Sequence, residues 1–277
     1  MPESLGAMFD LSGRVAILTG GAGMLGRQYT RTLLAAGARV AVVDLPAAKP
    51  AEAATSAVHE AGGEAIGIAI DVTQPQDVAQ MSAEVREKWQ RIDILINNAA
   101  IDPKFDAAVA NRQANTFEDY PLSAWRQSLE VNLTGAFLCC QEVGRVMSAA
   151  RRGVVVNVSS TYGVVSPDQR LYQRDGETEQ KLFKPAAYAV TKAGIAHLTR
   201  YLATYWAPHN IRVNTLTPHG VFNAQDEQFV RRYAERCPLG RMARLDEMNG
   251  PLLFLVSDAS SYMTGANLVV DGGWTAW

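Results

Sequence analysis

The feature that most constrains the fold of this chain is a regular alternation between short apolar runs and longer helical patterns. The apolar runs are rich in Val and Ile, and they span residues 15–20, 40–44, 65–71, 92–99, 153–160, 211–218 and 267–273. They are apolar on both faces, as strands covered by helices on two sides require. The helical patterns span residues 24–36, 50–61, 75–89, 122–149, 187–205 and 246–257. This order predicts an α/β protein with right-handed βαβ units and an open, doubly wound parallel sheet of seven strands.

Two long polar segments, residues 102–123 and 165–185, interrupt this rhythm. No low-complexity linker divides the chain, so we expect residues 1–277 to form a single domain that carries these two insertions. Both segments follow predicted strands, and open α/β sheets bind ligands at the carboxyl ends of their strands. Long loops at this edge are typical of lids and binding loops, and plain solvated insertions are the alternative.

Composition and charge narrow the range of partners. The 277 residues carry a formal net charge of −2 and a pI near 6.1, which argues against nucleic acid or an anionic membrane as the main partner. The cysteines, Cys139, Cys140 and Cys237, lack the spacing of a metal site or redox motif, so no metal is predicted. No signal peptide and no apolar run of membrane-spanning length is visible, and we therefore expect a cytoplasmic protein.

A glycine-rich turn, TGGAGMLG, joins the first predicted strand to the first predicted helix. Gly20, Gly23 and Gly26 allow the backbone to turn tightly and to approach a pyrophosphate, while the helix N-terminus offers unpaired N–H groups to its oxygens. Glycines occur in turns of every kind, but this cluster lies after a strand and before a helix in a βαβ unit. The turn therefore predicts a dinucleotide-binding site, with Met24 and Leu25 as part of it.

The choice of cofactor is predicted by Asp44, which ends the second predicted strand. A carboxylate there can accept hydrogen bonds from both hydroxyls of an adenosine ribose, and it repels a 2′-phosphate. Leu45 and Pro46 follow, so the next residues supply no Arg or Lys for a phosphate. The pattern favours NAD over NADP. The alternative is that Asp44 is only a turn residue at a strand end.

Nine motifs in a fixed order belong to one pattern. They are the glycine turn, Asp44, Asp71–Val72, Asn97–Ala100, Val131–Gly135, Asn157–Ser160, Tyr188-x-x-x-Lys192, Pro218–Val221 and Val270–Gly273. Together they resemble the short-chain dehydrogenase/reductase family from Leu11 to Gly273. The resemblance implies a Rossmann fold and an oxidoreductase that acts on CH–OH groups. It also implies cofactor contacts from the glycine turn and from Asp44, Leu45, Asp71, Val72, Asn98, Ala99, Ala100, Tyr188, Lys192, Pro218 and Val221.

The same resemblance implies a catalytic tetrad of Asn132, Ser160, Tyr188 and Lys192. A free tyrosine has a pKa of about 10, and a lysine one helical turn away on the same face lowers it. We therefore expect Tyr188 to move the proton of the substrate hydroxyl, while Lys192 tunes Tyr188 and holds the nicotinamide ribose. Ser160 would bond the substrate oxygen, and its Ser-x-x-Gly spacing favours it over the neighbouring Ser159. Asn132 would position a water beside Lys192, unless it is only a kink residue within its helix.

Among the departures from the family pattern, two involve candidate site residues. Met24 stands where the short-chain type has its second motif glycine, and Gly20, Gly23 and Gly26 follow the spacing of the extended, sugar-nucleotide-modifying branch instead. His219 stands where a glycine usually follows the proline. The His219 side chain either faces the substrate or fills space in its loop, and the sequence does not separate these two interpretations.

The substrate is expected to be small and polar. Both insertions mix Lys and Arg with Asp and Glu, which suits a sugar or sugar acid better than a steroid or a fatty chain. We expect segment 165–185 to stay out of the core and to close over the substrate. The candidate contacts are Ser160, Tyr162, Arg170, Arg174, Lys184 and His219. The alternative is that the charges pair with one another or face solvent.

Three functions from different classes fit these residues. The first is an NAD-dependent dehydrogenase that oxidises a secondary alcohol of a sugar-like substrate. The second is a biosynthetic carbonyl reductase or an epimerase-type enzyme that uses the same tetrad on another cyclic or hydroxy-acid substrate. The third is a dinucleotide sensor without chemistry, and the intact tetrad argues against it because a sensor does not need Tyr188.

The resemblance also implies a homodimer or homotetramer. The family packs the helices predicted here over 122–149 and 187–205 against their symmetry mates, and the second of them carries the small residues Ala193 and Gly194. The aromatic C-terminus, from Trp274 to Trp277, is a further place where we expect a subunit contact.

Overall fold

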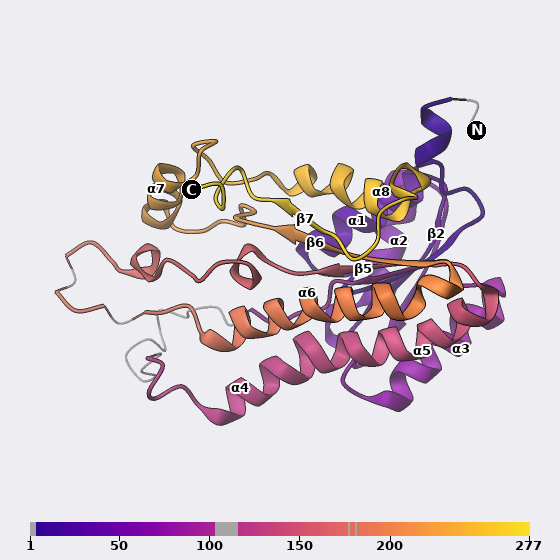
Figure 1. Cartoon of the computed structure of the whole chain (residues 1–277), viewed down its shortest axis with the longest axis horizontal. Coiled ribbons are helices and arrows are strands. Elements are labelled where there is room, and N and C mark those ends of the chain that lie inside the picture. The colour runs from indigo at the N-terminus through magenta and orange to yellow at the C-terminus, as the bar shows by residue number, and fades with distance from the viewer. Residues whose placement is uncertain (1–3, 103–115, 177, 181) are drawn as a thin grey trace.

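One parallel sheet forms the centre of the fold (Figure 1). The computed structural model describes residues 4–102, 116–176, 178–180 and 182–277. Within these residues, seven strands lie in the order β3-β2-β1-β4-β5-β6-β7. Their bounds are Val15–Thr19 (β1), Arg39–Asp44 (β2), Glu64–Ala69 (β3), Ile94–Asn97 (β4), Gly153–Val158 (β5), Ile211–Pro218 (β6) and Asn267–Val270 (β7). Every pairing is parallel, which confirms the predicted doubly wound α/β fold.

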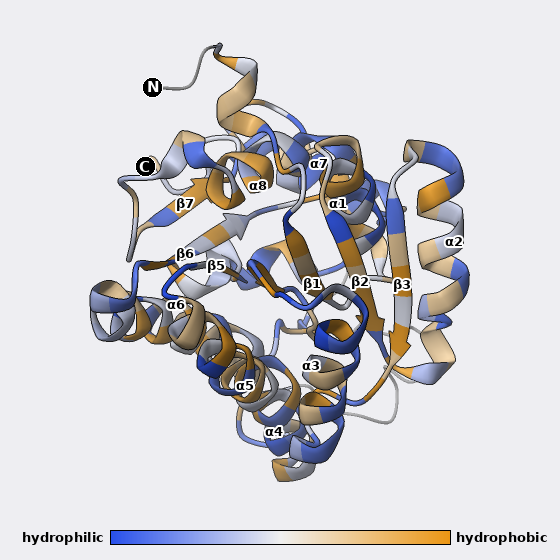
Figure 2. Cartoon of the chain, turned by 90° about the vertical axis from the view of Figure 1, so that its right-hand side faces the viewer, coloured by the Kyte–Doolittle hydropathy of each residue, from blue (hydrophilic) through white to orange (hydrophobic). Residues whose placement is uncertain are grey.

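Helices cover both faces of this sheet (Figure 1). One layer holds α1 (Met24–Ala35), α2 (Pro50–Ala61) and α8 (Asn249–Val256), and the other holds α3 (Pro75–Trp89), α4 (Leu122–Leu129), α5 (Gly135–Ala150) and α6 (Ala186–Trp206). Strand β1 explains the two layers, because Ala16 and Leu18 pack on the first and Val15 and Ile17 on the second. In Figure 2 the hydrophobic strands β1, β2 and β3 stand between α2 and α3. No described helix is both long and apolar enough to span a membrane.

The helices differ from the predicted ones in three places. A π-helical turn at Glu130–Thr134 separates α4 from α5 inside the stretch 122–149. The stretch 246–257 begins as a 3-10 turn at Leu245–Met248, and α8 follows it. Helix α7 (Glu227–Arg236) was not predicted, because its sequence EQFVRRYAER is mostly charged and resembles a polar loop.

Segment 165–185 is partly packed, contrary to the expectation that its charges would keep it out of the core. It contains a 3-10 turn, Gln169–Tyr172, from which Leu171 packs with Tyr233 of α7 and with Trp274. Residues 177 and 181 of this segment, and residues 103–115 of the other insertion, lie outside the described part of the chain.

The C-terminal tryptophans have two different environments. The Trp274 ring stacks on Tyr233 with 4.8 Å between ring centroids, and Trp274 is 1% exposed within its own chain. The expectation of a subunit contact is therefore wrong for Trp274, because aromatic neighbours of the same chain bury it. Trp277 remains 78% exposed.

Candidate active site

The glycine turn lies at the carboxyl end of β1, where its geometry excludes larger residues. Gly20 has a φ of +64°, and a Cβ atom there would lie 2.8 Å from the Cα atom of Ala99. A Cβ atom at Gly26 would lie 2.1 Å from the Gly20 carbonyl oxygen. Helix α1 begins at Met24, and no side chain among the described residues caps it. Its first N–H groups are therefore available to a phosphate, and Met24 does not prevent the turn.

The loop after β4 is tied to this turn. The Asn98 amide group donates hydrogen bonds to the carbonyl oxygens of Thr19 and Gly20, at 3.2 and 3.0 Å. The Thr19 hydroxyl accepts from the backbone N–H groups of Asn98 and Ala99, both at 3.1 Å. The two loops therefore form one rigid wall, which fits a dinucleotide lying along the strand ends.

Asp44 is held beside the turn at the end of β2. Its carboxylate accepts hydrogen bonds from the backbone N–H groups of Ala22, at 3.1 Å, and Leu45, at 2.9 Å. Asp71, near the start of the loop after β3, accepts from the N–H and hydroxyl of Thr73 at 2.9 and 2.8 Å, so its carboxylate folds back on its own turn. The N–H groups of Ala22 and Leu45 fix the Asp44 carboxylate at the carboxyl end of β2.

Tyr188 and Lys192 lie one turn apart on α6. The Lys192 ammonium donates to the Val158 carbonyl oxygen at 2.9 Å and lies 5.8 Å from the centroid of the Tyr188 ring. The Ser160 side chain acts on Tyr188 and lowers its pKa. The Ser159 hydroxyl instead donates to the Lys192 carbonyl oxygen at 2.7 Å, which ties β5 to α6. Of the two serines, Ser160 is the one that affects the pKa of Tyr188.

Asn132 lies in the π-helical turn and is 2% exposed. Its amide oxygen accepts from the Ile101 N–H at 2.8 Å, and its amide nitrogen donates to the Ile101 carbonyl at 3.0 Å and to the Thr191 hydroxyl at 3.2 Å. Asn132 therefore joins the loop after β4 to α6 beside Lys192. Single π-turns within helices are frequent at functional sites.

Burial sets the charges of the tyrosine and the lysine. Burial raises the pKa of Tyr188, the Asp102 carboxylate raises it further, and the Ser160 side chain lowers it. Burial lowers the pKa of Lys192 to about 8, a shift that Asp102 opposes and Lys184 reinforces. The pKa of Tyr188 is therefore raised rather than lowered, contrary to the expectation from the sequence, and Lys192 is not among the causes of the shift.

His219 belongs to an aromatic cluster rather than to an open pocket. Its ring lies 4.5 Å from Trp274, 5.2 Å from Tyr162 and 5.2 Å from Tyr233, measured between centroids. Burial lowers the pKa of His219 to about 4, so the imidazole is neutral at physiological pH. The Tyr162 hydroxyl is in turn 3.1 Å from that of Tyr172. Of the two interpretations of His219, this geometry favours the one in which it fills space.

The three cationic candidates of segment 165–185 have different positions. The Arg170 side chain is 80% exposed and pairs with Asp168 at 2.8 Å. Arg174 is exposed. Lys184, in contrast, is 8% exposed, bonds the Asp102 carboxylate, and lies 4.3 Å from the Tyr188 ring centroid. Asp102 was not predicted as a partner of Lys184 beside the tetrad. Its place directly after the Asn97–Ile101 loop was the available signal.

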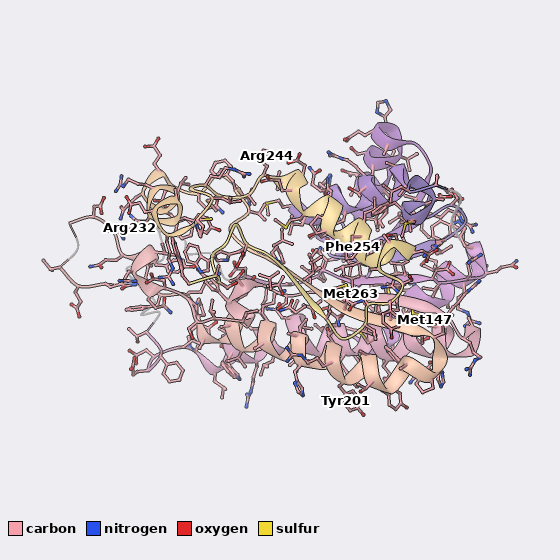
Figure 3. All side chains as sticks on the ribbon, turned by 45° about the horizontal axis from the view of Figure 1, so that its top comes forward. Met147, Tyr201, Arg232, Arg244, Phe254 and Met263 are labelled. Carbon is pink, nitrogen blue, oxygen red and sulfur yellow. The ribbon has the colours of Figure 1, made fainter. Side chains whose placement is uncertain are left out.

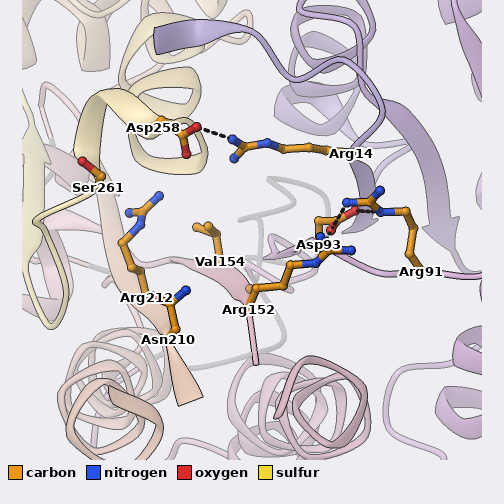
Figure 4. Close-up of a pocket in the computed structure, with 10 residues that line it drawn as sticks. Arg14, Arg91, Asp93, Arg152, Val154, Asn210, Arg212, Asp258 and Ser261 are labelled. Carbon is orange, nitrogen blue, oxygen red and sulfur yellow. Dashed lines mark hydrogen bonds and ion pairs between the residues drawn. The ribbon is translucent and has the colours of Figure 1, made fainter. Parts of the chain in front are cut away.

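A separate cavity of about 360 Å³ lies at the opposite, amino-terminal edge of the sheet (Figure 4). Its walls carry Arg14, Arg91, Asp93, Arg152, Arg212 and Asp258. Arg14 pairs with Asp258 at 2.6 Å and Arg91 with Asp93 at 2.7 Å, so the carboxylates are engaged by neighbouring guanidinium groups. Asp93 also accepts the Val15 N–H at 2.9 Å, which anchors the start of β1. This cavity contains none of the predicted site residues.

Comparison with known proteins identifies the family. Residues 14–172 match the family described as short chain dehydrogenase, and residues 177–275 match the family described as enoyl-(acyl carrier protein) reductase. The chain belongs to the short-chain dehydrogenase/reductase family. It is accordingly an oxidoreductase of the kind that acts on CH–OH groups, with the nicotinamide dinucleotide, NAD or NADP, that is typical of the family.

Individual relatives cover nearly the whole chain. The cis-4-hydroxycyclohexanecarboxylate dehydrogenase of Sinomonas cyclohexanicum is 35% identical over 95% of this chain and 97% of its own. An NAD-dependent glycerol dehydrogenase of Listeria innocua is 30% identical over 96% of both chains. Among solved structures, a gluconate 5-dehydrogenase from Burkholderia cenocepacia in complex with NADP and tartrate superimposes with a TM-score of 0.84, at 29% identity and 98% coverage of both chains.

Proposed function

We propose that the protein is an NAD-dependent dehydrogenase that oxidises a secondary alcohol of a small polar substrate. The observation that carries this proposal is that Ser160 and Lys192 both lie close to Tyr188, while Asn132 bonds Thr191 on the same helix. Nicotinamide, when bound, accepts the hydride in oxidation and returns it in reduction. A sensor without chemistry has no use for this set.

The four side chains divide the remaining work. Tyr188 takes the proton of the substrate hydroxyl during oxidation and returns it during reduction. Lys192 stabilises the phenolate form of Tyr188 and contacts the nicotinamide ribose. Ser160 donates a hydrogen bond to the substrate oxygen and stabilises charge that develops there. Asn132 holds the π-helical turn and the loop after β4 against α6, beside a water path to Lys192.

The cofactor is assigned to residues around the strand ends. The phosphates lie on the turn formed by Gly20, Gly23, Met24, Leu25 and Gly26, where a Cβ atom would block close approach at Gly20 and Gly26. The adenosine end contacts Asp44, Leu45, Asp71 and Val72. The nicotinamide end contacts the Asn98–Ala100 loop, Tyr188, Lys192, Pro218 and Val221.

NAD is preferred over NADP because of Asp44. A fixed carboxylate accepts bonds from ribose hydroxyls and repels a 2′-phosphate. The relatives do not decide this point, since one is named NAD-dependent and another was solved with NADP.

Asp44→Ala is expected to weaken NAD binding by about 1–3 kcal/mol, the range for a hydrogen bond to a charged group. NADP binding should weaken less or improve, because the repulsion is removed. Titration calorimetry with both dinucleotides measures this, and Asp44→Asn separates charge from shape. A wild-type protein that binds NADP more tightly than NAD would contradict the assignment.

The substrate class follows from the polar surroundings of Tyr188. The relatives are named for glycerol, a hydroxycyclohexanecarboxylate and gluconate, which are polyols or hydroxy acids. A panel of sugars, sugar acids, cyclic alcohols and hydroxy acids should therefore include a compound that reduces NAD. Absorbance of NADH is the readout. No NADH from any member of the panel would overturn the proposed function.

We also propose that the chain assembles as a homodimer or homotetramer through the outer surfaces of α5 and α6. Phe137 on α5 is 46% exposed, and Tyr201 and Tyr205 on α6 are 61% and 64% exposed and stack at 6.0 Å. Figure 3 shows Tyr201 projecting away from the sheet. Exposed aromatic surface of this kind marks an interaction site.

Light scattering at micromolar concentration should give a mass of two or four times 30.0 kDa. The double variant Tyr201→Lys/Tyr205→Lys should shift this mass towards a single chain, because buried like charges oppose association. A wild-type mass of one chain would contradict the proposed assembly.

A further inference from the structure

Lys184 is a buried cation in direct contact with the catalytic tyrosine. Its side chain is 8% exposed, and its ammonium lies 4.3 Å from the centroid of the Tyr188 ring and 5.8 Å from that of Tyr162. An ammonium removed from water costs several kcal/mol unless an anion compensates it. The burial of the Lys184 ammonium therefore calls for a functional or structural explanation.

The preceding segment fixes the backbone of Lys184. The Gln169 side chain accepts from the Lys184 N–H at 2.7 Å and donates to the Lys184 carbonyl at 3.1 Å. The Gln180 side chain donates to the carbonyl oxygens of Gln169 and Leu182, at 2.6 and 2.7 Å. On the other side, Pro185 precedes α6 directly. Lys184 is thus held in place by the 165–185 insertion together with the helix that carries Tyr188.

The anion that compensates Lys184 is much less buried. It is the Asp102 carboxylate, whose side chain is 49% exposed. A fixed, buried ammonium therefore faces a half-exposed carboxylate beside the reacting hydroxyl of Tyr188. A buried ammonium beside an accessible carboxylate suits a site in which the carboxylate of a ligand replaces that of Asp102. The exchange leaves the charge next to Lys184 unchanged.

We propose that Lys184 binds the carboxylate of the substrate and that Asp102 occupies the same position when no acid is bound. This inference rests on the proposed dehydrogenase function and deepens it, because it defines the substrate as a hydroxy acid. The acid group lies near the carbon that reacts at Tyr188. A neutral polyol cannot displace Asp102 by charge exchange, so Lys184 discriminates in favour of acids.

The test compares the best hydroxy acid of the panel with its neutral primary amide. Lys184→Met, which keeps the length of the side chain and removes its charge, should raise KM for the acid by about 10- to 100-fold, as expected for a lost charge-assisted hydrogen bond. KM for the amide should change by less than about threefold, a change within the scatter of surface substitutions. Lys184→Arg should recover part of the preference for the acid.

Asp102→Asn distinguishes substrate binding from a purely structural ion pair. If Asp102 competes with the substrate, Asp102→Asn lowers KM for the acid, whereas loss of a structural pair raises KM for acid and amide alike. The matched control is Lys88→Met, because Lys88 is a lysine on the surface of α3 that pairs with Glu64 at 3.2 Å. Melting temperature and NAD affinity show that each variant is folded.

Two failures are distinguishable. A wild type that oxidises the acid, combined with equal effects of Lys184→Met on acid and amide, overturns the role of Lys184 and leaves the dehydrogenase function intact. Equal turnover of acid and amide by the wild type likewise overturns the role of Lys184 and leaves the dehydrogenase function intact. A wild type that forms no NADH from any compound overturns the proposed function and this inference with it.

Discussion

Turnover is expected to fall by about 10²- to 10⁴-fold when Tyr188 is replaced by phenylalanine, the range that general acid–base catalysis contributes. The substitution removes the hydroxyl that moves the proton and leaves the aromatic ring. The contacts of this ring with Lys184, at 4.3 Å, and with Lys192, at 5.8 Å, therefore persist. The affinity for NADH should remain within a few-fold. The measurements are steady-state kcat on the natural substrate and a fluorescence titration with NADH.

The matched control for this variant is Tyr262→Phe, because Tyr262 is fully exposed at 104% and lies in the turn before β7. It loses the same hydroxyl group and should keep wild-type kcat. Substantial turnover by Tyr188→Phe would show that another group moves the proton. A large loss of NADH affinity in that variant would show that the hydroxyl serves the cofactor rather than the reaction.

The sheet could be predicted from the sequence because its strands are apolar on both faces. In β2, Val40, Ala41, Val42 and Val43 are all fully buried, and successive residues face opposite helix layers. A run of this kind does not fit a sheet with one face in water. The glycine turn could be predicted for a similar reason, since a Cβ atom would clash with backbone atoms at both Gly20 and Gly26.

The parts of the site that depend on distant contacts could not be predicted. Lys184 and Asp102 are 82 residues apart, and neither belongs to a periodic pattern or a turn motif. Asn132 was a candidate through the family resemblance, but its bonds to Ile101, 31 residues away, and the π-helical turn that carries it have no local sequence signal. Such contacts follow from the fold as a whole.

The wrong expectation for Trp274 has a traceable cause. Helix α7 was missed because intrinsic charge dominates its sequence, although its hydrophobic residues Phe229 and Tyr233 lie four apart on one face. Without α7, the chain offered no partner for an aromatic C-terminus, and a second subunit was the remaining explanation. With α7 in place, Tyr233 stacks on Trp274 and buries it within the chain.

Lys192→Met is the second substitution with a large expected effect, and it should impair two properties at once. Lys192 is 4% exposed, so methionine fits its volume but removes the ammonium bonded to Val158. Turnover should fall by about 10²- to 10⁴-fold, because the phenolate of Tyr188 loses its neighbouring cation. NAD affinity should fall by about 1–3 kcal/mol, because a charged contact with the ribose is lost. Steady-state kcat measures the first effect, and a titration with NAD measures the second.

The double variant Tyr188→Phe/Lys192→Met tests whether the two residues act as one unit. If Lys192 promotes turnover through Tyr188, its charge has nothing left to tune once the hydroxyl is gone. The kcat of the double variant should then be no lower than the kcat of the less active of the two single variants. Its NAD affinity should match that of Lys192→Met. Multiplicative losses of kcat would mean that Lys192 contributes to the chemistry independently of Tyr188. Unchanged NAD affinity in Lys192→Met would remove the ribose contact from its role.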